Sequence, residues 1–251
     1  MENLQTGLNL TYLLFGALIA ALAMVQSIFG VGLLIFGTPA LLFVGVRFDE
    51  VLSVLLPASL SVSVLQILCD GRPKTSEIVG YFIYMLPALG IGLLVALFAH
   101  VVGLDLFICG LLLFAAVLRV SPGYREKLMA FAKRFSRTTL TAIGLVHGMT
   151  NMGGSLLEAY VSSRESEKLN IRQSIACGYA LLASSQLIVL ASVGRFQVSA
   201  ATGIAIVVAS GVFLTFGRRT FALIHQTRYK VFVSVLMVLA ASALIAKRAL
   251  V

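Results

Sequence analysis

The chain has few charged residues and no tryptophan. Charged side chains make up only 12% of its 251 residues, whereas 59% are hydrophobic and the mean hydropathy is +1.02. A soluble domain carries about 25% charged residues, so this composition excludes that class and indicates a polytopic membrane protein. The formal net charge is +9, but the basic residues lie in short loops between apolar segments. That pattern is typical of topology signals, and we expect no nucleic acid partner.

Cysteine is scarce as well. Cys69, Cys109 and Cys177 are scattered within or at the ends of apolar segments and lack the spacing of metal ligands. We therefore expect small core residues, with no disulfide, no metal site and no cofactor. The HExxH and GxSxG motifs and a facing pair of acidic residues are also missing, which argues against an intramembrane enzyme.

The chain does have a long apolar stretch, Leu8–Val46, about twice the length that one membrane helix needs. Phe29–Gly32 and Gly37–Pro39 interrupt it. In a helix interior Gly costs about 1 kcal/mol and Pro about 3 kcal/mol relative to Ala, so we predict a helix break at membrane depth. Because an unpaired backbone cannot face lipid, such a break has to line a cavity enclosed by protein, as in transporter binding sites.

A second copy of this break follows later in the chain. Aligning Ser27 with Gly148 brings the glycines of the first break onto the segment Gly148–Ser155, and it brings Gln66 to within one residue of Gln186. The order of apolar segments after each break is also the same. The sequence therefore indicates an internal repeat.

We predict an all-α polytopic fold of two inverted repeats, each made of a broken-helix hairpin followed by three spanning helices. Residues 1–120 form the first repeat, residues 121–138 a basic cytoplasmic linker with an interfacial helix, and residues 139–251 the second repeat. Ser155–Ser162 is too short to cross about 30 Å of hydrocarbon, so both broken pairs should be short helices that return to the side they left. The expected broken pairs are Leu10–Ile28 with Leu33–Val46, and Leu140–Thr150 with Ser155–Ser162. The expected spans are Val51–Cys69, Val79–Val102, Leu104–Val120, Ile175–Val193, Val198–Phe216 and Val231–Ala246.

The distribution of basic residues predicts the orientation. If both termini are outside, 15 of the 19 Lys and Arg residues fall in inside segments, and only Arg47, Arg195, Lys247 and Arg248 fall outside. The positive-inside rule then places both termini on the periplasmic or extracellular side of a bacterial inner membrane.

On these motifs the sequence resembles the TauE/SafE sulfite exporter family. The family pattern is a glycine-rich break with an apolar run into a proline, once per half, here Phe29–Gly32 with Pro39 and then Gly148–Ser155. The second copy departs from it, with Asn151 where a glycine is usual and Tyr160 where the proline would fall. The resemblance covers essentially the whole chain. It implies a secondary transporter that exports sulfite, a sulfonate or a similar small organic anion, with a passive anion channel as the alternative.

The breaks also predict a binding chemistry. A helix N-terminus carries unpaired N–H groups and roughly +0.5 of an elementary charge, and glycine lets an anion approach the backbone closely. Apart from Arg119 near the end of Leu104–Val120, the expected spans contain no Arg or Lys, so dipoles and neutral donors should balance the charge of the anion. The expected substrate-binding residues are Gly30, Val31, Gly32, Thr38, Pro39, Gln66, Thr150, Asn151, Met152, Gly153, Gly154, Ser155 and Gln186.

Each of these residues has a structural alternative. A Ser or Thr hydroxyl can bond back to its own helix, Gln66 and Gln186 can bond between helices, and glycines can serve close helix packing. We expect purely packing roles for Gly90, Gly92, Gly203 and Gly211.

Two ionisable residues, His147 and Glu158, lie close to the second break. We expect them to carry a proton that is coupled to anion movement, because charges at membrane depth are costly and usually functional. The alternative is that Glu158 lies near the inner interface and pairs with a basic loop residue. The expected partners are a small anionic substrate and the lipid bilayer. A second copy of the chain, in a homodimer, is a further alternative.

Overall fold

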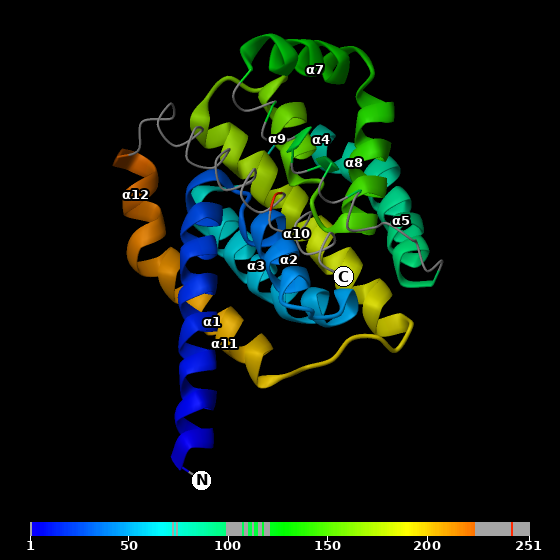
Figure 1. Ribbon diagram of the computed structural model, residues 1–251. Helices are drawn as coiled ribbons and strands as arrows, with labels where there is room; N and C mark the ends of the chain where they lie inside the picture. The colour runs from blue at the N-terminus through cyan, green and yellow to red at the C-terminus, as the bar shows by residue number, and fades with distance from the viewer. Residues whose placement is uncertain are drawn as a thin grey trace.

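The computed structural model describes residues 2–71, 73, 75–98 and 121–223, with single positions at 107, 110, 111, 113, 114, 117 and 242. All regular structure within these residues is helical (Figure 1). The predicted all-α class is therefore confirmed. Apart from the single positions, the expected spans Leu104–Val120 and Val231–Ala246 lie outside the described residues.

The first half begins with a helix that is longer than predicted. Its elements are α1 (Glu2–Phe29), α2 (Leu33–Phe43), α3 (Phe48–Asp70), α4 (Thr75–Gly80), the π-helical turn η1 (Tyr81–Met85) and α5 (Leu86–Phe98). The 28 residues of α1 extend about 42 Å at 1.5 Å per residue, enough to cross a bilayer. The expectation of a short first helix is wrong, because the helix continues through the first ten residues, which contain no proline.

The second half matches the predicted short pair more closely. Its elements are α7 (Pro122–Arg134), α8 (Ser136–Thr150), α9 (Gly154–Ser162), α10 (Lys168–Ser192), α11 (Ala200–Val212), the π-helical turn η2 (Phe213–Gly217) and α12 (Arg218–Leu223). The helix α7 covers most of the predicted linker and lies across one end of the molecule, opposite the N-terminus (Figure 1). The following helix, α8, already begins within that linker.

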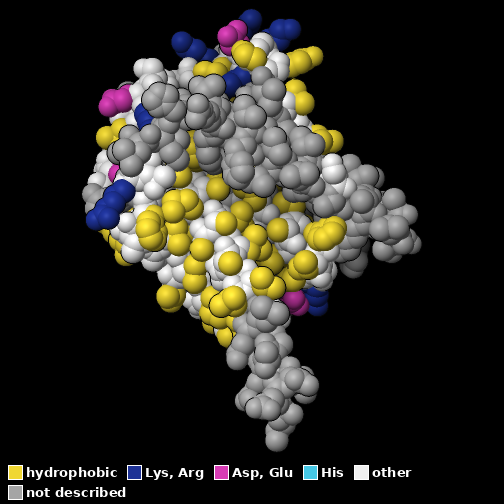
Figure 2. Space-filling model, turned by 60° about the vertical axis from the view of Figure 1, so that its left-hand side comes forward, with side chains coloured by type: hydrophobic (Ala, Val, Ile, Leu, Met, Phe, Trp, Pro, Cys, Tyr) yellow, Lys and Arg dark blue, Asp and Glu magenta, His cyan; other side chains and the backbone are white. Residues whose placement is uncertain are grey.

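Five of the described helical stretches are long and apolar enough to cross a membrane. They are Thr11–Phe29, Phe48–Asp70, Glu77–Phe98, Lys168–Ser192 and Ala200–Gly217. Hydrophobic side chains cover the middle of the face in Figure 2, whereas several Lys and Arg side chains gather at the end that carries α7. This arrangement fits a molecule whose apolar belt lies in lipid and whose basic end lies in water.

The helices α3 and α10 run antiparallel and are tied by an ion pair at each end. At one end Asp70 Oδ2 lies 2.6 Å from Arg172 Nη2, and both side chains are buried. At the other end Asp49 Oδ2 lies 3.5 Å from Arg195 Nη1. Each pair joins a residue of the first half to a residue of the second half, so the halves are held together through these two helices.

Glycines bring the backbones of α5 and α8 into contact. A Cβ at Gly144 or Gly148 of α8 would overlap the carbonyl oxygen of Met85 or Leu89, and a Cβ at Gly92 would overlap that of Leu145. Small residues at such positions let membrane helices approach closely, which is how helices associate where lipid removes the hydrophobic driving force. The predicted packing role is therefore confirmed for Gly92. At Gly90, Gly203 and Gly211 a Cβ would meet no described atom within 4 Å, so no close packing is seen there.

We expect Gly144→Ala to destabilise the protein, because the added methyl group has to push the backbones of α5 and α8 apart. Overpacking of this kind costs about 1–3 kcal/mol. The midpoint of thermal unfolding in detergent should fall clearly below that of the wild type. Gly90→Ala, on α5 with open space around it, is the matched control and should unfold like the wild type. Equal midpoints for the two variants would contradict the close packing.

Candidate substrate site at two helix breaks

At the first break the chain turns through a left-handed residue. Gly30 has a φ of +74°, and its N–H donates to the carbonyl of Gln26 over 2.8 Å. Gly32 then immediately precedes α2, and a Cβ there would lie only 2.7 Å from the backbone nitrogen of Gln26. Both positions need glycine, the first for its conformation and the second for space.

The second break also turns through a left-handed residue. Asn151 has a φ of +61°, and its N–H donates to the carbonyl of His147 over 2.7 Å. Gly153 immediately precedes α9, and a Cβ there would lie 2.7 Å from His147 Cβ. The alignment that pairs Ser27 with Gly148 also pairs Gln26 with His147. Asn is one of the few residues other than glycine that tolerates the left-handed region, which explains its presence where the family pattern has glycine.

The two predicted glutamines donate hydrogen bonds to carbonyls at the ends of the broken helices. Gln66 Nε2 donates to the carbonyls of Gln26 and Ser27 over 3.1 and 3.2 Å. Gln186 Nε2 lies 3.4 Å from the carbonyl of His147. The amide nitrogens thus make interhelical bonds to carbonyls in the last turn of each broken helix, and at Gln26 and His147 they add to the backbone bonds from Gly30 and Asn151. The Oε1 atoms of both glutamines are buried without a partner among the described residues.

The two breaks lie along the same helix, α10. A Cβ at Gly30 would touch Ile175, and a Cβ at Gly154 would overlap the hydroxyl of Tyr179, one turn further along α10. Thr38 of α2 connects them, because its Oγ1 accepts a 2.9 Å hydrogen bond from Asn151 Nδ2.

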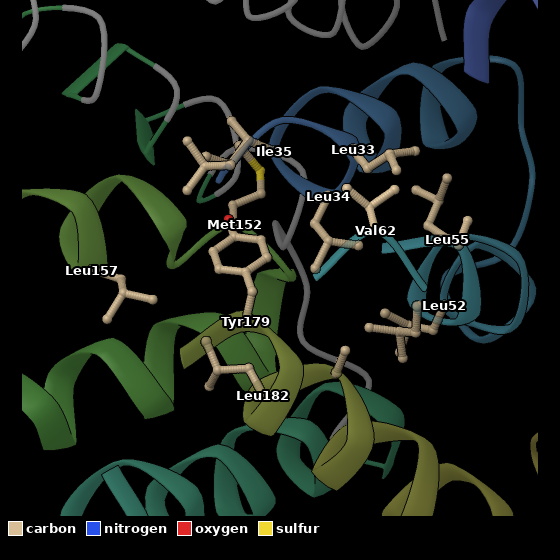
Figure 3. Packing of buried hydrophobic residues seen from close by; sticks show 14 of the residues in the cluster. Leu33, Leu34, Ile35, Leu52, Leu55, Val62, Met152, Leu157, Tyr179 and Leu182 are labelled. Atoms are coloured by element: carbon tan, nitrogen blue, oxygen red, sulfur yellow. The ribbon is translucent and has the colours of Figure 1, made fainter. Parts of the chain in front are cut away.

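Apolar side chains seal the space around this link. Figure 3 shows Ile35 of α2, Met152 of the second break and Tyr179 of α10 within one packed cluster. Of the other predicted residues, Val31 and Pro39 are also buried and contribute apolar surface.

Polar groups without partners gather at the second break. His147, Asn151 and Gln186 are fully buried. Both ring nitrogens of His147, Asn151 Oδ1, Gln186 Oε1 and Ser155 Oγ have no hydrogen-bond partner among the described residues. Such groups cost about 1–3 kcal/mol each when they are buried and unpaired, so they typically mark a place where water or a ligand binds. This concentration makes the second break the chemical centre of the candidate site.

The surroundings of Thr150 and of the pair His147 and Glu158 differ from those expected for substrate binding and for a shared proton-coupling site. The hydroxyl of Thr150 bonds back to the carbonyl of Val146 over 2.7 Å, as the structural alternative expects. His147 and Glu158 lie in different surroundings, because the His147 ring meets the Tyr179 ring edge-on, with 5.8 Å between centroids, whereas Glu158 lines a cleft with basic residues such as Lys168.

Sequence reasoning missed Arg172. The expected span Ile175–Val193 begins after Arg172, so this residue was expected outside the membrane segment. The structure corrects this, because Arg172 lies inside α10, is 4% exposed, and approaches the first break, with Nη1 3.4 Å from the carbonyl of Ser27. Its position near the start of an apolar helix left no signal in the hydropathy pattern. Tyr179 was missed as well, since an aromatic residue in a span is usually part of the core.

We expect Asn151→Ala to be less stable than Asn151→Gly. Both variants lose the hydrogen bond to Thr38, so the difference between them isolates the backbone conformation. Alanine in the left-handed region costs about 1–2 kcal/mol, whereas glycine is not penalised. Thermal unfolding of the two purified variants in the same detergent measures this difference. Equal stability would mean that residue 151 is not left-handed in the folded protein.

The comparison with known families gives one match, and it agrees with this geometry. The family model described as "Sulfite exporter TauE/SafE" matches residues 13–244, nearly the whole chain. Neither the comparison with curated proteins nor the comparison with solved structures found a match. With two glycine-dependent breaks inside an all-helical membrane fold, the chain belongs to the TauE/SafE family of membrane sulfite and anion exporters.

Proposed function

We propose that the protein is a secondary transporter that exports a small sulfur-containing oxyanion from a site formed by the two helix breaks. The observation that carries this proposal is the group of buried, unpaired polar atoms at the second break. These atoms are fully enclosed at His147, Asn151 and Gln186. Enclosure favours a carrier, which has to rearrange to admit its substrate, over the alternative of a passive channel.

We also infer that the two halves are inverted repeats. In support, α1 and α8 end, and α2 and α9 begin, at positions that the alignment of Ser27 with Gly148 makes equivalent. The helices that follow the hairpins, α3 and α10, occupy the same place in their halves. They run antiparallel, since the last residue of α3, Asp70, pairs with Arg172 near the start of α10. Equivalent helices that run in opposite directions are what inversion requires.

The unpaired groups favour a monoanion that still carries a proton, such as hydrogensulfite. The hydroxyl of Ser155 and one ring N–H of His147 can donate, whereas Asn151 Oδ1 and Gln186 Oε1 can only accept. A hydrogen-oxyanion matches this mixture, because its O–H donates while its other oxygens accept. The start of α9 adds N–H donors and a partial positive charge beside Ser155.

The charge distribution supports an orientation with both termini outside. The helix α7, which carries Lys133 and Arg134 in its last turn, lies at the end of the molecule opposite the N-terminus (Figure 1). The positive-inside rule supports a cytoplasmic location for that end. Export then carries the anion from the end with α7 toward the end with the N-terminus.

We expect Ser155→Ala to weaken sulfite transport. A hydrogen bond to a charged group contributes about 1.5–3 kcal/mol, so the apparent affinity should fall about tenfold or more. Sulfite uptake into proteoliposomes under an imposed gradient measures this. Ser184→Ala is the matched control, because its hydroxyl bonds back to the Ala180 carbonyl of its own helix, and it should transport like the wild type. An absence of saturable sulfite flux by the wild type contradicts the proposed function.

We further propose that transport is coupled to protons through Glu158, which is half-buried and lines a cleft with Arg125, Lys168 and Arg172. Glu158→Gln keeps the shape of the side chain and removes its titration. We expect this variant to transport sulfite without the dependence on a pH gradient that the wild type shows. The comparison requires flux measurements with and without the gradient. A variant that stays fully responsive to the gradient rules out Glu158 as the coupling group.

A further inference from the structure

A small cleft of about 80 Å³ opens near the end of the molecule that carries α7. Its described lining comes from the end of α1, from α7 and α9, from the start of α10 and from α12. Figure 1 shows α7 at the top of the molecule and α12 at its left side. The cleft is separate from the unpaired polar groups of the second break, none of which lines it.

Positive charge dominates this cleft. Its charged described residues are Arg125, Lys168, Arg172 and a single carboxylate, Glu158. The cations come from different helices, α7 and α10, so the fold brings them together from distant parts of the chain. Charges of one sign in a concave site focus the field and attract an anion.

Two of these cations share one aromatic ring. The guanidinium carbon of Arg172 lies 3.4 Å from the ring centroid of Phe221, and Lys168 Nζ lies 4.2 Å from the same centroid. Lys168 Nζ also donates to the carbonyl of Phe221 over 2.6 Å. The ring stabilises each cation, but the arrangement holds two like charges close together. Arg172 also forms the 2.6 Å ion pair with Asp70, which balances its charge, so Lys168 and Arg125 are the cations that would attract an anion.

The cleft leads to the first helix break. Its lining includes Ile28 and Phe29, the last residues of α1, and Ile175, on which Gly30 rests. Arg172 is buried at this boundary and reaches the carbonyl of Ser27. An anion in the cleft is therefore next to the break that, under the proposed function, forms part of the transport site.

We propose that this cleft is the cytoplasmic loading site of the exporter, where Lys168 and Arg125 bind a small oxyanion before it enters the membrane interior. This inference rests on the proposed function for the direction of transport. The binding itself does not depend on it. Glu158 weakens anion binding in the same cleft, because its negatively charged carboxylate repels the anion.

The test measures sulfite binding to the purified full-length protein in detergent by isothermal titration calorimetry. Lys168→Gln and Arg125→Gln should each raise the Kd about three- to tenfold, because each removes one charge-assisted contact from a partly exposed site. Glu158→Gln should lower the Kd. Lys133→Gln is the matched control, since it removes an exposed charge from α7 outside the cleft, and it should leave the Kd unchanged.

The dependence of the Kd on salt concentration is a second measurement, and it would not change if Lys168 had only a structural role. Raising the ionic strength should weaken binding by the wild type, and the dependence should be smaller in Lys168→Gln. The proposal is overturned if the wild type binds no sulfite, or if Lys168→Gln and Arg125→Gln behave like Lys133→Gln. Sulfite flux by the same proteins in proteoliposomes separates the two proposals. If sulfite binds with the expected pattern but is not transported, the proposed transport function is wrong and the binding site in the cleft stands. If sulfite is transported but the variants have the Kd of the wild type, the binding site in the cleft is wrong and the transport function stands.

Discussion

Every backbone hydrogen-bonding group at membrane depth needs a partner inside the protein, and the structure at both breaks follows from this constraint. A helix that stops in the membrane leaves carbonyls without partners. Here the left-handed residue after each broken helix supplies an N–H, and a glutamine from the next long helix supplies a side-chain donor. The same solution occurs twice, around Gln26 and around His147. The breaks are thus stable features of the fold, and polar atoms beside them, such as Gln66 Oε1 and Asn151 Oδ1, have no hydrogen-bond partner among the described residues.

The sequence predicted the breaks well because glycine has a direct physical meaning there. Gly30, Gly32 and Gly153 are needed for conformation or for space, so their positions could be located to the residue. The length of α1 was not predictable in the same way, because the residues before Leu10 are neither clearly apolar nor helix-breaking. The close contact of α5 with α8 was also missed at Gly144, since a glycine in an apolar helix does not indicate which helix it faces.

The candidate site was predicted in part. Gln66 and Gln186 were identified as a matched pair in the sequence, and the structure places them in matched roles at the two helix ends. Arg172 was missed because a charged residue at the start of a span resembles a loop residue, whereas its burial and its ion pair with Asp70 appear only in the structure. The equivalence of Gln26 and His147 was present in the alignment of the two halves. It became informative only once their carbonyls were seen to accept the same bonds.

The backbone contact between α5 and α8 limits how this transporter can move. A carbonyl of one helix sits where the other has only a hydrogen atom, at Gly144, Gly148 and Gly92. If one helix slid past the other by a single residue, larger side chains would take the place of these glycines and would clash with the carbonyls. We therefore expect the two helices to move as one rigid unit, together with the hairpin that α8 begins. If the protein changes conformation to expose the second break on the other side of the membrane, the movement has to take place at the outer surfaces of this unit, away from the contacts at Gly92, Gly144 and Gly148.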